Sequence, residues 1–203
     1  ELNLAGCKAL MTAGPADGVF PRLGQMTNLT ELDLNRCGLR GELDAAVGNL
    51  VNLANLLLKG NSELTSISEE ALGQLVNLTW LAVDCCKSLV ALPASIGRLT
   101  SLEGLYCSRG GLEALPPQIG DCIALKRLYL EFCKSLTHLP PSLSRCTALE
   151  FLGLEDTPAM QSPPPEVVAQ IQGVDPAPVL DYLRKLDAGR LTKGAAAAGA
   201  AGP

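Results

Sequence analysis

Leucine recurs at a regular interval along most of the chain. Six segments open with Leu-x-x-Leu-x-Leu or a close variant, and their starts lie 24, 25, 24, 23 and 24 residues apart. They begin at Leu29, Leu53, Leu78, Leu102, Leu125 and Leu149, and an earlier copy without its first residue contributes Leu2 and Leu4. Self-similarity at a fixed period of this length indicates a solenoid of stacked repeats. We therefore predict about seven repeats over residues 1–172.

Each repeat is predicted to contain one short strand and one short helical arc. The alternating Leu-x-Leu at the head of each copy favours a strand with one buried face, and equal spacing stacks these strands in parallel, about 4.8 Å apart. Two copies continue with Leu-Pro-x-x-Ile-Gly, at residues 92–97 and 115–120. Proline suits the first turn of a short helix and glycine suits its end. We expect a parallel sheet on the concave face and helical or 3₁₀ arcs on the convex face.

A column of small residues follows the strands. It contains Cys7, Cys37, Asn61, Cys86, Gly110, Cys133 and Thr157. Asparagine at such a position can bond to neighbouring backbone groups along a ladder, and cysteine acts there as a small buried hydrophobe. Cys107, Cys122 and Cys146 replace core leucines. Seven of the eight cysteines are therefore expected in the core, and only Cys85 should face outward.

The cysteines also bear on the cellular compartment. Small buried thiols suit a reducing environment, so we expect reduced cysteines in a cytoplasmic protein. Adjacent coils could instead bring Cys7 and Cys37, or Cys122 and Cys146, within disulfide range. Two Asn-Leu-Thr sequons would indicate secretion. However, asparagine precedes the opening leucine in three copies, so these sequons follow from the repeat itself.

The C-terminal part of the chain departs from the repeat pattern. Asp175 and Pro176 precede apolar residues at helical spacing. These are Val179, Leu180, Leu183 and Leu186. Aspartate as N-cap and proline in the first turn predict a helix over about 176–188. We assign residues 173–190 to a helix that caps the open end of the array. Residues 191–203, mostly glycine and alanine, are predicted to be a linker or disordered.

The repeats resemble those of the leucine-rich repeat family over about residues 1–172. The phrase Cys-Lys-Ser-Leu-x-x-Leu-Pro, at residues 86–93 and 133–140, is similar to intracellular repeats of plant-type disease-resistance receptors and Ras-group proteins. Residues 39–43 instead resemble a turn of plant receptor ectodomains. The Pro-Pro-Glu-Val segment and the later Tyr-Leu-Arg helix are similar to the end of intracellular arrays joined to GTPase domains. The resemblance implies an α/β leucine-rich repeat solenoid, a curved horseshoe.

Composition and charge argue against several function classes. The 203 residues include 16 Lys and Arg against 21 Asp and Glu, so the net charge of −5 provides no basic field for nucleic acid. No apolar run approaches the roughly 18–20 residues that a membrane span needs. A single histidine without a Cys-x-x-Cys pair argues against metal, and His138 has no evident catalytic partners. No phosphate-binding loop is present. We predict a non-enzymatic protein with no catalytic residue, metal or cofactor.

The residues between the leucines point away from the core and are free to meet a partner. Five of the seven aromatic residues fall on this exposed face: Trp80, Tyr106, Tyr129, Phe132 and Phe151. Aromatic and arginine side chains carry most of the binding energy at interfaces. We predict a partner-binding surface on the concave face. It consists of these rings with Arg109, Arg127, Glu131 and Glu155.

This surface predicts a protein partner with an apolar anchor and with basic groups toward the acidic C-terminal end. Because the rings are exposed in this interpretation, we expect their removal to leave the stability of the fold nearly unchanged. A neighbouring domain of the same polypeptide could instead pack permanently on this face. Scattered exposed aromatics without a function are the remaining alternative.

Three functions fit these features. The first is an intracellular protein-binding scaffold in signal transduction. The second is the ligand-sensing or autoregulatory region of a larger signalling protein of the GTPase, kinase or immune-receptor type. The third is an extracellular recognition ectodomain, which would need a signal segment and paired cysteine caps. The chain opens at Glu1 and not at a methionine, so we expect a fragment of a longer protein.

Overall fold

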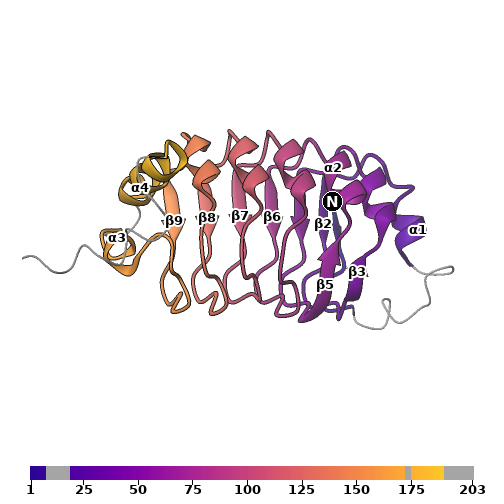
Figure 1. The fold of residues 1–203 in the computed structure, drawn as a ribbon. Helices are drawn as coiled ribbons and strands as arrows, with labels where there is room; N and C mark the ends of the chain where they lie inside the picture. The colour runs from indigo at the N-terminus through magenta and orange to yellow at the C-terminus, as the bar shows by residue number, and fades with distance from the viewer. Residues whose placement is uncertain (8–18, 172–174, 190–203) are drawn as a thin grey trace, which may run out of the picture.

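The computed structural model describes residues 1–7, 19–171 and 175–189. Seven short strands form one sheet, in the order β1-β2-β4-β6-β7-β8-β9, and every neighbouring pair is parallel (Figure 1). The strands are β1 (Leu2–Asn3), β2 (Glu31–Asp33), β4 (Asn55–Leu57), β6 (Trp80–Ala82), β7 (Gly104–Tyr106), β8 (Arg127–Tyr129) and β9 (Phe151–Gly153). Each repeat therefore contributes one strand, as the leucine period predicts.

The middle leucine of each strand forms the centre of the core. The parallel register aligns Leu32, Leu56, Leu81, Leu105, Leu128 and Leu152 in one row. All six side chains are fully buried and belong to one continuous hydrophobic cluster. Burying a leucine side chain contributes about 1.5–3 kcal/mol, so this row is a large share of the stabilisation. The predicted α/β solenoid is confirmed.

Each coil returns to the next strand through a short helix or a 3₁₀ arc. The arcs are η2 (Ala45–Asn49), η3 (Ala94–Arg98), η4 (Pro117–Asp121) and η5 (Pro141–Arg145), and the helices are α1 (Val19–Leu23) and α2 (Glu69–Gln74). A proline in extended conformation precedes η3, η4 and η5. Because its φ is fixed and it has no N–H to satisfy, proline suits this start. The arcs predicted at residues 92–97 and 115–120 are confirmed.

Two neighbouring coils carry an additional strand that the sequence interpretation missed. β3 (Arg40–Leu43) and β5 (Glu63–Ile67) pair in parallel with one register shift. In later coils a proline ends the corresponding segment, and only isolated bridges form, from Ala114 to His138 and from His138 to Ser162. The second sheet therefore stops after two strands.

Small side chains tie neighbouring coils together. Asn61 is fully buried, donates to the carbonyls of Leu34 and Leu58, and accepts the Leu39 N–H at 3.1 Å. Five thiols donate to a carbonyl of the preceding coil at 3.0–3.3 Å: those of Cys37, Cys86, Cys122, Cys133 and Cys146. The ladder role predicted for the asparagine is confirmed, and the cysteines add a second kind of link to it.

All eight cysteines are free thiols. Six are buried as predicted, but Cys7 is only half-buried, which corrects its assignment to the core. It lies in the first coil, where the described residues provide a neighbouring coil on one side only. Cys85 is also half-buried and therefore less exposed than expected. Burial raises the pKa of Cys86 and of Cys146 to about 11, and that of Cys122 to about 12.

Two helices cover the last coil. α3 (Pro165–Val168) and α4 (Ala177–Asp187) lie beside β9, and α4 packs against η5 and α3 (Figure 1). Val179, Leu180 and Leu183 are the buried residues of α4. The helix thus lies within one residue of the range predicted at each end. The linker predicted at 191–203 lies outside the described residues.

Candidate functional site

Four aromatic rings form a continuous row on the face of the sheet opposite the leucine core, here called the open face. The rings are those of Trp80 from β6, Tyr106 from β7, Tyr129 from β8 and Phe151 from β9. The centroids of successive rings lie 5.7, 4.5 and 4.4 Å apart. The two tyrosines are stacked, with 11° between their planes. This aromatic ladder unites four of the five rings that the sequence singled out.

A glycine in the middle of the ladder makes its geometry possible. The sheet register aligns Trp80 with Gly104, while Tyr106 lies two residues further along the same strand. A Cβ atom at Gly104 would lie 2.2 Å from Cε3 of Trp80. Because residue 104 has no side chain, the indole ring crosses its position and reaches Tyr106. The sequence signal for this contact was available, since glycine inside a strand often marks a close approach.

The rings are less exposed than the sequence interpretation assumed. Trp80, Tyr106, Tyr129 and Phe151 are all half-buried, because each ring covers part of its neighbour. Burial also raises the pKa of Tyr106. Stacked aromatic pairs contribute about 0.5–1.5 kcal/mol beyond their burial. The premise that the rings are fully exposed is therefore corrected, while their small contribution to stability stays a prediction.

Two arginines lie against rings of this face. The guanidinium of Arg127 lies 5.9 Å from the centroid of Trp80, and that of Arg109 lies 4.3 Å from the centroid of Phe132. Phe132 does not extend the ladder, because it belongs to the turn after β8, not to the strand. The nine residues predicted for the surface thus separate into the ladder with Arg127, a turn pair, and an acidic group.

The acidic group lies at the C-terminal end of the ladder. Glu131 and Glu155 line a cavity of about 450 Å³ together with Phe151 and two apolar residues, Val168 and Ile171. Glu131 accepts the hydroxyl of Ser108 at 2.6 Å. The carboxylates were predicted here, but the apolar wall was not. It comes from α3 and the residues after it, and only the packing of that segment beside β9 brings it to the site.

The turn after every strand adopts the same unusual backbone conformation, which the sequence did not reveal. At the same place in each coil, one residue has φ between 51° and 78°: Gly6, Arg36, Gly60, Cys85, Arg109, Phe132 and Asp156. From Gly6 to Phe132, each donates its N–H to a carbonyl of the next coil at 2.7–2.9 Å. This ladder imposes one conformation on all coils, so five side chains occupy a region that favours glycine.

Other candidate chemistry is sparse in the described ranges. His138 is exposed, and its Nδ1 lies 2.8 Å from the hydroxyl of Thr137. Within residues 1–7, 19–171 and 175–189, no group of three or more His, Cys, Asp or Glu is placed to hold a metal ion. The same part of the chain contains no helix with the length and apolar character to cross a membrane.

Comparisons with known proteins agree with this architecture. The model of the Leucine Rich Repeat family matches residues 28–50. The leucine-rich repeat domain of the type III effector XopL shares 29% identity, with a TM-score of 0.55, over 75% of this chain and 61% of that chain. A comparison with curated proteins gives no match.

Two plant-type receptor structures share the fold at lower identity. PEPR1, in its complex with AtPEP1, matches at 22% identity and a TM-score of 0.60, over 67% of this chain and 19% of that chain. The plant peptide hormone receptor RGFR1, in complex with RGF2, matches at 23% identity and a TM-score of 0.51, over 66% and 26%. The chain thus spans less than two thirds of each of these three structures.

The fold defines a class of repeat protein in which stacked coils present one open sheet face to solvent. The leucine period, the seven parallel strands and the matches above identify this fold as the leucine-rich repeat solenoid. The family generally serves protein–protein interaction.

Proposed function

We propose that this chain is a non-catalytic module that binds a protein partner on the open face, with the aromatic ladder as the anchor. The observation that carries the proposal is the stacked row of four rings across β6 to β9, next to Arg127. Rings of this kind form hot spots at interfaces, and a contiguous apolar patch on a surface marks an interaction site.

The chemistry of the partner follows from the rings of the ladder and from the carboxylates at its C-terminal end. The half-buried rings favour an apolar or aromatic anchor on the partner. Glu131 and Glu155, beside the last ring, favour a basic group at that end. The proposal includes a role as a scaffold in signal transduction, in the cytoplasm. The six buried free thiols support a reducing compartment, since such thiols persist there.

A second candidate is that the ladder binds a neighbouring domain of a longer chain and serves autoregulation or ligand sensing. The match to XopL favours it, because that structure is itself the leucine-rich repeat domain of an effector. An extracellular recognition role is supported only by the fold that the chain shares with PEPR1 and RGFR1.

The experiment uses Trp80 as a reporter, since it is the only tryptophan of the chain. Affinity capture from a lysate provides a candidate partner, and titration with that purified partner should change the emission of Trp80. The variant Tyr106→Ala/Tyr129→Ala keeps the reporter and should weaken binding by about 100-fold or more, since hot-spot residues contribute about 2 kcal/mol or more each.

A matched control removes apolar side chains elsewhere on the surface. Val76, Val90 and Ile123 are exposed and lie outside the ladder. The variant Val76→Ala/Val90→Ala/Ile123→Ala should bind as the wild type does. Equal binding by the ladder variant, with its fold verified by circular dichroism, would contradict the proposal. If the isolated chain captures no partner, and another domain covers the ladder in a longer chain, the second candidate is favoured.

A further inference from the structure

Five consecutive coils each place one cation near the turn that follows the strand. The residues are Arg36, Lys59, Lys87, Arg109 and Lys134, here called the cationic rim. All five are exposed. Neighbouring strands are about 4.8 Å apart, so the four steps from the first coil to the last span about 20 Å. This continuous positive row stands out in a chain whose net charge is −5.

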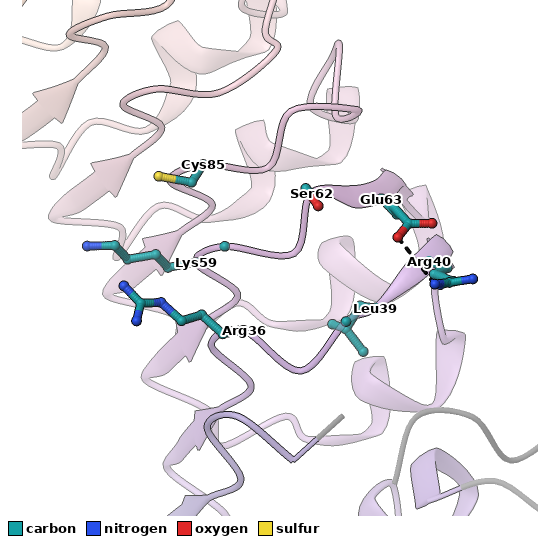
Figure 2. A pocket seen from close by; sticks show the side chains of 9 residues that line it. Arg36, Leu39, Arg40, Lys59, Ser62, Glu63 and Cys85 are labelled. Atoms are coloured by element: carbon teal, nitrogen blue, oxygen red, sulfur yellow. Dashed lines mark ion pairs between the residues drawn. The ribbon is translucent and has the colours of Figure 1, made fainter. Parts of the chain in front are cut away.

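Two cavities hollow the surface along the rim. The first, of about 450 Å³, is lined by Arg36, Lys59 and Cys85 among others. Figure 2 shows these three side chains pointing the same way from neighbouring coils. The second, of about 550 Å³, is lined by Lys87, Arg109 and Lys134, again with Cys85. Cys85 lines both cavities, so the two lie next to each other along the rim.

The rim cations are not neutralised within the described ranges, where none of the five forms an ion pair. Glu63 lines the first cavity, but its carboxylate is already paired with Arg40 at 3.3 Å (Figure 2). Burial raises the pKa of Asp84, although the nearby Lys59 acts in the opposite direction. Asp156 is the one carboxylate among the residues that line the second cavity.

The backbone holds two of these cations at a conformational cost. Arg36 and Arg109 have φ values of 55° and 58°, in a region where a side chain costs about 1–2 kcal/mol relative to glycine. Gly60 also makes room for Arg36, because a Cβ atom there would lie 2.9 Å from its Cγ.

We propose that the cationic rim is a second docking surface, which binds an acidic segment of a partner protein. Its length fits about six extended residues, at about 3.3 Å for each residue. Carboxylate side chains would pair with the successive cations, and Phe132 and Cys85 would contact the apolar parts of the segment. Nucleic acid fits less well, because a polyanion longer than the rim would extend over Asp156, Glu131 and Glu155 at the C-terminal end.

This proposal is independent of the aromatic ladder, and its test uses a defined probe. A fluorescently labelled peptide of about eight residues, with alternating glutamate and serine, covers the length of the rim. Its binding is measured by fluorescence anisotropy at about 50 mM salt, where exposed charges are weakly screened. The same peptide with glutamine in place of glutamate should bind at least about tenfold more weakly, because it lacks the charges that the rim recognises.

Charge-matched variants locate the site. Arg36→Gln/Lys59→Gln/Lys87→Gln should weaken binding of the acidic peptide by about tenfold or more. Arg22→Gln/Arg98→Gln/Arg184→Gln removes three charges from the helices and arcs and should change affinity by less than about twofold. The ring variant Tyr106→Ala/Tyr129→Ala should also bind as the wild type does, which separates this proposal from the preceding one.

Three results would overturn the inference. The glutamine peptide could bind as tightly as the acidic one. The two charge-matched variants could lose affinity equally, which would indicate a response to overall charge. A labelled single-stranded oligothymidylate could bind more tightly than the acidic peptide through the same rim residues. That result would show that the rim recognises phosphate groups and not carboxylates.

Discussion

The coils of residues 29–77 and those of residues 78–157 share one core but differ on both surfaces. In the N-terminal coils the open face is polar, with Asn55 donating to Glu31 at 2.8 Å, and a second small sheet forms from β3 and β5. In the C-terminal coils the open face carries the aromatic ladder, and the segments that correspond to β3 and β5 form only isolated bridges. The same leucine framework thus supports two different exteriors.

The coil-to-coil links differ in the same way. Asn61 bonds to three backbone groups in the N-terminal region, where Cys37 occupies the other place, whereas thiols occupy two of the four corresponding places in the C-terminal region, those of Cys86 and Cys133. An amide satisfies buried polar groups directly, while a thiol fills space and donates only a weak bond. The difference shows that the repeat requires a small residue at this linking position and leaves its chemistry free.

The largest expected effect tests whether the core is shared. Leu56→Ala and Leu105→Ala each remove a fully buried side chain from the same row of the sheet, one in each region. Each should lower the free energy of unfolding by about 3–4 kcal/mol, through lost burial and an internal cavity. Urea denaturation measures the free energy of unfolding of both variants. A cost limited to one variant would show that the two regions do not share a single core.

The next effect concerns the small buried residue that links each coil to its neighbour. Asn61→Ala should cost about 3 kcal/mol, because it leaves buried backbone groups such as the Leu39 N–H without a partner. Cys133→Ala, in the C-terminal region, should cost about 1 kcal/mol, since it removes a small apolar group and a weak hydrogen bond. Thermal melts of both variants give the comparison. Equal losses would show that the two kinds of link have the same strength.

Alkaline pH should act mainly on the C-terminal coils, which contain five of the six buried thiols. Burial raises the pKa of Cys86 and Cys146 to about 11 and that of Cys122 to about 12, from an ordinary 9.0. The unfolded chain therefore ionises first, so stability is complete below pH 9 and falls as pH rises through 11 and 12. The loss is on the order of 2 kcal/mol per thiol near the upper end.

Urea unfolding at a series of pH values measures this loss. The variant Cys122→Ala/Cys146→Ala removes two of the titrating groups and should show a shallower decline above pH 9. A decline as steep as that of the wild type would mean that other groups control the alkaline transition.

The smallest effect lies at the junction of the two regions. The carboxylate of Glu69, in α2, accepts the N–H groups of Ala94 and Ser95 at the start of η3, both at 2.7 Å. Glu69→Gln should cost about 1 kcal/mol, as for the loss of a helix cap. Glu70→Gln is the matched control, and differential scanning fluorimetry should separate the two variants. Equal thermal stability of the two variants would show that apolar packing alone stabilises the junction.

The candidate site was only partly predictable. The x positions of the repeat located Trp80, Tyr106, Tyr129 and Phe151 on one face, because side chains alternate along a strand. Their stacking depends on Gly104 and on the register between β6 and β7, which sequence spacing does not specify. The cationic rim was missed for a related reason: its five members occupy different positions of the repeat and meet only along a shared turn.

The sequence by itself determined the solenoid, the seven strands of the main sheet and the buried leucine row, since a fixed period leaves one way to bury each leucine against the next. It also determined the terminal helix, from its cap and its apolar spacing. Only the tertiary structure decided the second sheet, the half-burial of the rings and the left-handed turns. These depend on contacts between coils, where hydrogen bonds and ring packing link residues about 24 positions apart.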